Sequence, residues 1–199
     1  MLRTRHIVIL VSGCLLSCLL GLGGYRYRIE QQQRCDPATL PLGEVHDGDL
    51  IFSEGHSLKS DLVRMAARSY HSDYSHVGFL RHRGAELRVV HMSIDDGCLL
   101  EESLEEFIRK NRVRSIGIGR LCREPAPERL NRTLDSLLLT GKAFDFDFDL
   151  QDDGAYYCTE LIVKALSAAG APLRTLATQE GILYPPALLN PETSSLINP

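Results

Sequence analysis

Apolar and polar positions follow two recurring patterns along the chain, one typical of strands and one typical of helices. Short apolar runs bounded by glycine or polar turns predict strands, and leucine-rich stretches with helical spacing predict helices. The expected strands are residues 48–52, 74–80, 87–92, 97–100 and 113–120, and the expected helices are residues 57–68, 104–110, 127–139 and 158–169. Strands grouped between helices, without a strand–helix–strand repeat, indicate an α+β fold.

Four local features sharpen this pattern. Residues 81–86, with Arg83-Gly84 at their centre, suit a hairpin between two neighbouring strands. Ser60 is expected to cap the first helix, and Gly141 is expected to end the third. Residues 145–149 alternate aspartate with phenylalanine, which favours a strand with one polar and one aromatic face over a metal site.

Residues 7–25 carry no charged side chain, and Arg3 and Arg5 precede them. At about 1.5 Å per helical residue, this run nearly spans a hydrocarbon layer of roughly 30 Å. A basic start followed by an apolar run is typical of a signal sequence or signal anchor. We expect an uncleaved anchor with the following domain on the extracytoplasmic (periplasmic) side. A lipoprotein signal acylated at Cys14 or Cys18, or a cleaved signal, is the alternative.

The chain accordingly divides into four segments. Residues 1–28 form the membrane anchor or signal, residues 29–44 a polar linker, residues 45–190 a single domain, and residues 191–199 a flexible tail. The domain is long enough to bury a core of its own.

Composition excludes several classes of function. With 44% hydrophobic residues, 24% charged residues and a net charge of −4, the chain has no basic surface that would indicate a nucleic-acid partner. The six cysteines include no CxxC pair beyond the first apolar run, so neither a zinc site nor a thioredoxin-like motif is indicated. Pairing among Cys35, Cys98 and Cys122 stays open. No metal and no cofactor is expected.

Three side chains are candidates for nucleophilic chemistry. Cys158 stands at the predicted start of an apolar helix, where free backbone N–H groups and the helix dipole stabilise a thiolate and lower the thiol pKa. His76 and His91 lie in two strands that the hairpin would pair, which would bring their imidazoles within a few ångströms of each other. A cysteine, a histidine base and a second polar group that orients the base form the general triad arrangement.

Each of these residues alone also fits a purely structural role. A histidine in an apolar strand is more often a core residue than a catalyst, and a single cysteine on an apolar helix is more often a filler. The remaining candidates, His46, His56, His71 and His82, lie in polar surroundings and are expected at the surface.

Four short sequence blocks, taken in their order, favour a catalytic role for these residues over a structural one. They are Gly48-Asp-Leu-Ile-Phe52, Asp73-Tyr-Ser-His-Val-Gly78, Gly141-Lys-Ala-Phe-Asp145 and Tyr157-Cys-Thr-Glu-Leu161. Together they resemble the permuted NlpC-type, papain-like cysteine hydrolases, and specifically the YiiX/YebB-like branch. The resemblance covers about residues 45–166. In that branch the histidine strand comes first and the cysteine helix last, as here.

The resemblance implies a circularly permuted papain-like (NlpC-type) fold, with a small antiparallel sheet or barrel packed against helices. The cysteine would open a helix in the C-terminal half. Cys158 matches the family nucleophile and His76 the general base. His91 occupies the third position, where this branch often has glutamate and the related lecithin retinol acyltransferase-like families have histidine. Tyr74 and Glu160 match supporting positions.

The implied function is that of a membrane-associated cysteine hydrolase, amidase-like or peptidase-like, acting through a thioacyl-enzyme. Its substrate would contain an amide bond in a peptide or a cell-wall peptide. Two alternatives stay open: a lipid-directed acyl hydrolase or acyltransferase of the lecithin retinol acyltransferase-like type, and a non-catalytic ligand-binding domain. No oligomeric state is predicted.

Overall fold

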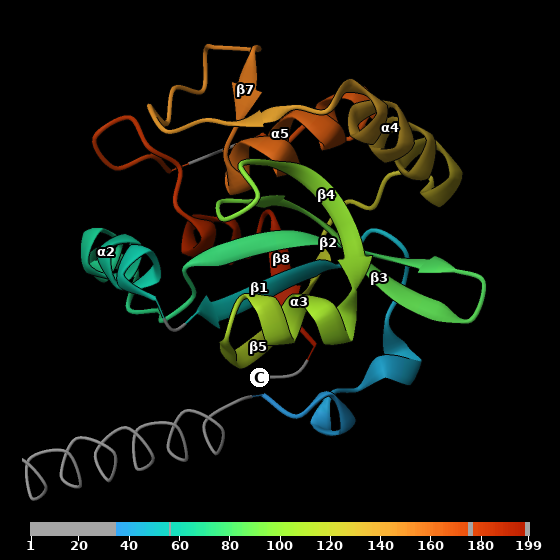
Figure 1. Ribbon diagram of the computed structural model, residues 1–199. Coiled ribbons are helices and arrows are strands. Elements are labelled where there is room, and N and C mark those ends of the chain that lie inside the picture. The colour runs from blue at the N-terminus through green and yellow to red at the C-terminus, as the bar shows by residue number, and fades with distance from the viewer. Residues whose placement is uncertain (1–34, 56, 175–176, 198–199) are drawn as a thin grey trace, which may run out of the picture. The chain divides into compact units, whose positions relative to one another are not determined.

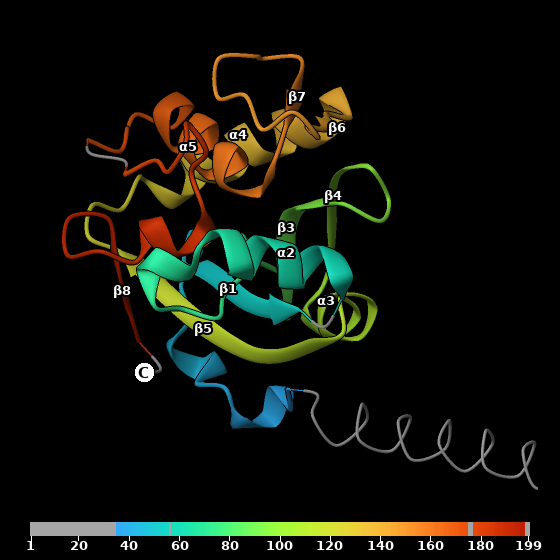
Figure 2. The ribbon, with the colours of Figure 1, turned by 90° about the vertical axis from the view of Figure 1, so that its left-hand side faces the viewer.

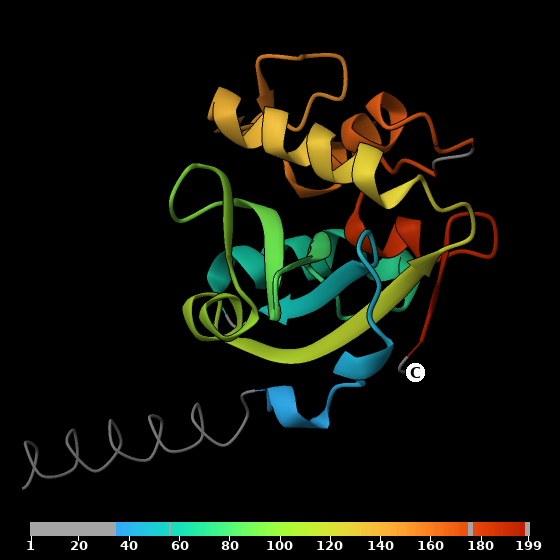
Figure 3. The same cartoon turned by 90° about the vertical axis from the view of Figure 1, so that its right-hand side faces the viewer.

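A curved, mostly antiparallel sheet organises the chain, with helices on both of its sides (Figures 1 and 3). The structure, a computed structural model, describes residues 35–55, 57–174 and 177–197. In this part of the chain, eight strands are hydrogen-bonded in the order β7-β6-β4-β3-β2-β1-β5-β8. The strands are β1 (Leu50–Gly55), β2 (His76–Arg83), β3 (Glu86–Ser93), β4 (Cys98–Ser103), β5 (Val113–Leu121), β6 (Ala143–Phe144), β7 (Ala155–Tyr156) and β8 (Ser194–Leu196).

The helices follow the leucine-rich stretches closely. They are α2 (Leu58–Ala66), α3 (Leu104–Lys110), α4 (Pro127–Thr140) and α5 (Cys158–Ala168), with short 3-10 turns at Pro37–Thr39, Leu42–Glu44, Arg68–Tyr70 and Pro185–Leu188. The predicted hairpin is confirmed: β2 ends at Arg83 and β3 begins at Glu86, with Gly84 at a φ of 65° in the turn. Gly141, at a φ of 59°, ends α4 as expected. The α+β prediction is therefore confirmed.

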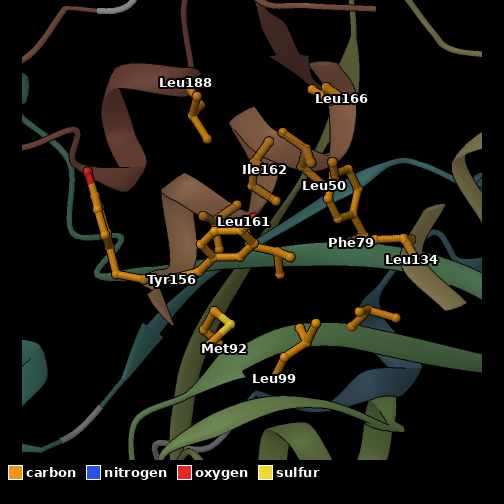
Figure 4. Close-up of a cluster of buried hydrophobic side chains, with 14 of the residues drawn as sticks. Leu50, Phe79, Met92, Leu99, Leu134, Tyr156, Leu161, Ile162, Leu166 and Leu188 are labelled. Atoms are coloured by element: carbon orange, nitrogen blue, oxygen red, sulfur yellow. The ribbon is translucent and has the colours of Figure 1, made fainter. Parts of the chain in front are cut away.

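The central strands are buried on both faces, so they separate two hydrophobic cores. Side chains of β1, β2 and β3 that point to one face pack against α4 and α5, and Figure 4 shows part of this larger core around Leu161 and Ile162. The intervening side chains, such as Ile51 and Val89, pack against Phe107 and Ile108 of α3. Because a strand alternates its side chains between faces, a single strand can support both cores.

The Gly48-Asp-Leu-Ile-Phe52 block has a clear structural reason at its first two positions. Gly48 has a φ of 100°, a conformation that residues with a side chain rarely adopt. Asp49 is buried and accepts hydrogen bonds from Arg120 Nε at 3.1 Å and Nη2 at 2.8 Å. This pair fastens the start of β1 to the end of β5.

Two local predictions are wrong. Residues 145–149 form no strand, because Asp145 accepts hydrogen bonds from the backbone N–H groups of Asp147 at 2.7 Å and Asp149 at 2.8 Å. A side chain that captures nearby backbone donors turns the chain instead of extending it. The cap of α2 is Ser57, whose hydroxyl accepts from the backbone N–H of Ser60.

The two ends of the domain also differ from expectation. Within the segment 191–199, for which the sequence predicts a flexible tail, Ser194–Leu196 form β8, which pairs with β5. Residues 35–44, expected within the linker, belong to the compact unit that begins at Cys35, and Leu40 and Leu42 pack against the smaller core. Residues 1–28, the expected membrane segment, lie outside the described residues. Among the helices that the structure describes, none has the length and apolar character needed to cross a membrane.

Candidate active site

The β2–β3 hairpin brings two imidazoles together. His76 Nε2 lies 3.0 Å from His91 Nδ1, as the hairpin predicted, and His91 is fully buried. Gly78 makes this approach possible: a Cβ atom there would lie 2.9 Å from the Cβ of His91 and 2.9 Å from the carbonyl oxygen of Val90. Packing thus explains the glycine of the Tyr-Ser-His-Val-Gly block.

Cys158 is the first residue of α5, as predicted. The hydrogen-bonded pairing of β2 with β3 ends at Phe79 and Val90. Two residues before Phe79 in β2, the backbone N–H of Val77 donates a hydrogen bond to the Cys158 sulfur. The sulfur therefore lies beside the residue that follows His76 in β2. Both His76 and Cys158 line the same cavity.

The protonation states of this pair differ from the expected thiolate. Burial raises the pKa of Cys158 to about 11, although the backbone N–H groups of Val77, Thr159 and Cys158 itself act to lower it. Burial also lowers the pKa of His76 to about 3, and His91 acts in the same direction while Glu102 opposes it. Desolvation thus outweighs the helix start, and the resting pair is a neutral thiol and a neutral imidazole.

A carboxylate that the sequence analysis missed lies behind His91. His91 Nε2 is 3.0 Å from Glu102 Oε1, and Lys110 Nζ is 2.7 Å from Glu102 Oε2. Burial alone would raise the pKa of Glu102, but hydrogen bonds from His91 and Lys110 lower it below its ordinary value. The missed signal was strand length, since β4 extends to Ser103 and pairs Glu102 with Val89, close to His91.

Phe107 of α3 packs against both imidazoles. Its ring lies edge-on to His91, with centroids 4.9 Å apart, and is nearly parallel to His76, with centroids 6.0 Å apart. This apolar contact limits ring rotation and water access on the α3 side. The alignment of the two imidazoles therefore rests on packing as well as on hydrogen bonds.

The cavity has a volume of about 630 Å³ and contains both polar and apolar walls. Its apolar walls include Leu62 and Val63 of α2, which faces the viewer in Figure 2, together with Phe144 and Phe148. A more polar part is lined by Ser57, Asp95, Lys110, Asn111 and Arg112. The cavity is large enough to hold a small organic group beside the thiol and the imidazole.

The two expected supporting residues do not line this cavity. The Tyr74 ring is tilted by 40° relative to the Phe52 ring, with ring centroids 5.8 Å apart, and its hydroxyl lies against Gly117. Glu160 is buried on α5, where burial raises its pKa to about 7, and Lys164 Nζ lies 3.7 Å from its Oε1. His46, His71 and His82 are exposed, as predicted, and His56 lies outside the described residues.

Comparison with known proteins identifies the relationship. The sequence pattern of a family described as "Permuted papain-like amidase enzyme, YaeF/YiiX, C92 family" matches residues 44–192. The chain belongs to this amidase family. This is the family that the four sequence blocks indicated. Its description names the YaeF/YiiX group of permuted papain-like enzymes and does not name NlpC. Its members are permuted papain-like hydrolases, which confirms the expected fold class.

A solved structure shows the same fold. The crystal structure titled as that of metalloprotein yiiX from Escherichia coli O157:H7 superposes with a TM-score of 0.63 at 22% sequence identity. The match covers 76% of this chain and 96% of yiiX. Among the described residues of this amidase-family chain, no three His, Cys, Asp or Glu side chains are arranged to hold a metal ion. No curated protein matches the chain.

Proposed function

We propose that this member of the family is a cysteine-dependent amidase with Cys158 as nucleophile, His76 as general base and His91 as the group that orients His76. The observation that carries the proposal is the shared cavity: the thiol at the start of α5 and the hydrogen-bonded histidine pair both border it. The substrate would be an amide within a peptide or a cell-wall peptide.

The protonation states define the first step. Because both groups rest in their neutral forms, the thiol transfers its proton to His76 as the sulfur attacks the amide carbonyl carbon. The backbone N–H groups at the start of α5 stabilise the negative oxygen that develops. The C–N bond then breaks, and the leaving amine takes the proton from His76, which leaves a thioester on Cys158.

Water completes the reaction. His76 accepts a proton from the water molecule that attacks the thioester carbonyl, and the carboxylic acid product leaves as the sulfur regains this proton. His91 holds the His76 ring through the 3.0 Å hydrogen bond during both steps. Its replacement removes orientation but leaves the nucleophile and the base in place.

The test compares full-length variants on a panel of acylated peptides, with turnover followed by mass spectrometry of the products. Cys158→Ala is expected to abolish turnover and the trapped acyl-enzyme, and His76→Ala to lose most activity. His91→Ala is expected to lower kcat about 10- to 1000-fold, because it removes the orientation of His76 but keeps the nucleophile and the base. Cys122→Ala, which changes an exposed cysteine away from the cavity, is the matched control and should keep wild-type activity.

Two outcomes would overturn the proposal. Turnover that survives in Cys158→Ala would show that another residue performs the chemistry. If the wild-type protein binds ligands in the cavity without converting any amide or ester, the domain is a binding module.

The apolar walls of the cavity support a second candidate, a lipid-directed acyl hydrolase or acyltransferase. The same thioester intermediate would form from an ester or thioester, and an acceptor other than water would release the acyl group in a transferase. Parallel assays with acyl esters and acyl peptides separate the two, because the amidase releases an amine and the lipid-directed enzyme an alcohol or a thiol.

A further inference from the structure

The hydrogen-bond chain from His76 continues through His91 to a buried carboxylate. Glu102 is only 4% exposed and holds three polar contacts: His91 Nε2 at 3.0 Å, Lys110 Nζ at 2.7 Å and Asn111 Nδ2 at 3.4 Å. The last two side chains come from the end of α3 and the residue that follows it. A buried carboxylate with this set of donors is kept ionised.

The ionised state of Glu102 determines which group donates and which accepts in each hydrogen bond from His76 to Glu102. A carboxylate only accepts hydrogen bonds, so His91 Nε2 must carry a hydrogen and donate it. A neutral His91 then has a bare Nδ1, which accepts from Nε2–H of His76. A neutral His76 that is protonated on Nε2 has a bare Nδ1, and this is the ring nitrogen left for the thiol proton.

We propose that Glu102 is a positioning residue of the amidase: acting through His91, it sets the tautomer of His76 so that Nδ1 is free to act as the base. The inference rests on the proposed function. When His76 takes the thiol proton, the imidazolium donates to His91, and the negative charge of Glu102 stabilises it across the two hydrogen bonds. In the hydrogen-bond chain from His76 through His91, Glu102 thus supplies the carboxylate that the side chain of His91 lacks.

The substitution Glu102→Gln separates this role from simple packing. Glutamine has nearly the same shape, but its amide group also donates hydrogen bonds, so it can face His91 Nε2 with N–H. That arrangement reverses the donor and acceptor roles in both hydrogen bonds. His91 then donates from Nδ1 to Nε2 of His76, and His76 carries its proton on Nδ1, where it cannot act as a base. The wrong tautomer of a catalytic histidine costs on the order of 10⁴-fold in kcat in a serine-protease triad.

The kinetic experiment measures kcat and KM of full-length variants on one substrate that the wild-type protein converts through Cys158. Glu102→Gln is expected to lower kcat about 10²- to 10⁴-fold with KM nearly unchanged. Glu102→Asp keeps the acceptor-only carboxylate and should restore part of the loss. Glu105→Gln, an exposed glutamate on α3, is the matched control and should equal wild type.

Lys110→Met tests whether Glu102 acts only through its ion pair. This variant removes the 2.7 Å contact but leaves an acceptor-only carboxylate facing His91, so kcat should fall by less than it does in Glu102→Gln. Equal losses of kcat and of thermal stability in Lys110→Met and Glu102→Gln would reduce Glu102 to a structural ion-pair partner and overturn the proposal.

A second measurement does not depend on turnover. In NMR spectra of protein labelled with ¹⁵N-histidine, His76 and His91 should both carry their proton on Nε2, and Glu102→Gln should shift one or both toward Nδ1. Spectra of His76→Gln and His91→Gln assign the signals. A wild-type protein with protonated Nδ1 on His91 would overturn the role of Glu102 even if the amidase proposal holds. Turnover that is independent of Cys158 would overturn the amidase proposal, and the tautomers measured by NMR would then describe the hydrogen-bond chain without a catalytic role.

Discussion

Burial sets the chemistry of Cys158 and His76. Both side chains border the cavity, yet each is desolvated enough that its charged form is disfavoured. In the proposed mechanism a thiolate and an imidazolium form together, and the attraction between these opposite charges makes proton transfer less costly than charging either group alone. The raised pKa of Cys158 and the lowered pKa of His76 therefore favour proton transfer at the moment of attack over a preformed ion pair.

This leads to a prediction for the pH dependence of kcat/KM. The base must be unprotonated, and because the pKa of His76 is lowered to about 3, the acidic limb should fall well below the ordinary histidine pKa of about 6.5. Activity at pH 5 should thus remain close to activity at pH 7. The polar groups that act on His76 are His91, whose Nδ1 lies 3.0 Å from His76 Nε2, and Glu102 behind it, which opposes the lowering of the His76 pKa.

Acid unfolding must be separated from this effect. A histidine whose folded pKa is lowered binds fewer protons in the folded state, so its contribution to stability declines as the pH falls below about 6.5 and continues to fall towards about 3. Circular dichroism at each pH checks that the protein stays folded. A half-maximal kcat/KM near pH 6.5 in folded protein would show that His76 is solvated like an ordinary histidine.

At the scale of elements, the close approach of β2 and β3 determines the histidine geometry. Gly78 sits where any side chain would press on His91 and on the backbone of β3. Helix α3 closes the other side with Phe107, and its first turn is fixed by a capping box in which Ser103 and Glu106 bond each other's backbone N–H groups. The two imidazoles are thus held between a strand pair and a helix.

Gly78→Ala should therefore damage both activity and stability. The new methyl group would lie 2.9 Å from two heavy atoms, so His91 or the backbone of β3 must move. We expect the free energy of unfolding to fall by about 1–3 kcal/mol. We also expect kcat to fall at least tenfold, since His91 loses its alignment with His76.

Gly43→Ala is the control for that substitution, because a Cβ atom at Gly43 meets nothing within 4 Å. Chemical denaturation gives the free energies, and the amidase assay gives kcat. Wild-type kinetics in Gly78→Ala would mean that the β2–β3 spacing does not control the site.

At the scale of the whole molecule, every residue of the proposed site lies within the compact unit that begins at Cys35. The sequence also predicts a membrane anchor or signal in residues 1–28. Full-length protein should therefore fractionate with membranes, and deletion of residues 1–28 should give a soluble, folded domain with its amidase activity intact.

Membrane fractionation, gel filtration and circular dichroism test this prediction. Full-length protein in the soluble fraction would count against the anchor. A truncated protein that aggregates would show that residues 1–28 are needed to cover part of the domain, and the domain boundary would move.

The sequence by itself determined the elements and the family. Helical and strand periodicity placed α3 and α5 within a residue or so, because each presents an apolar face to a core. The hairpin signal at Gly84 predicted that the side chains of His76 and His91 lie close together, since a tight hairpin sets the two strands beside each other. The order of the four blocks then indicated the permuted papain-like family.

Only the tertiary structure decided the rest. Glu102 joins the histidines because β4 extends to Ser103 and pairs with β3. Val77 meets the Cys158 sulfur because α5 packs against β2, and this contact joins residues distant in the sequence. The raised pKa of Cys158 follows from burial, which no local pattern reports. At residues 145–149 the alternation of aspartate and phenylalanine predicts a strand. The Asp145 carboxylate instead accepts hydrogen bonds from the backbone N–H groups of Asp147 and Asp149, and the chain forms a turn.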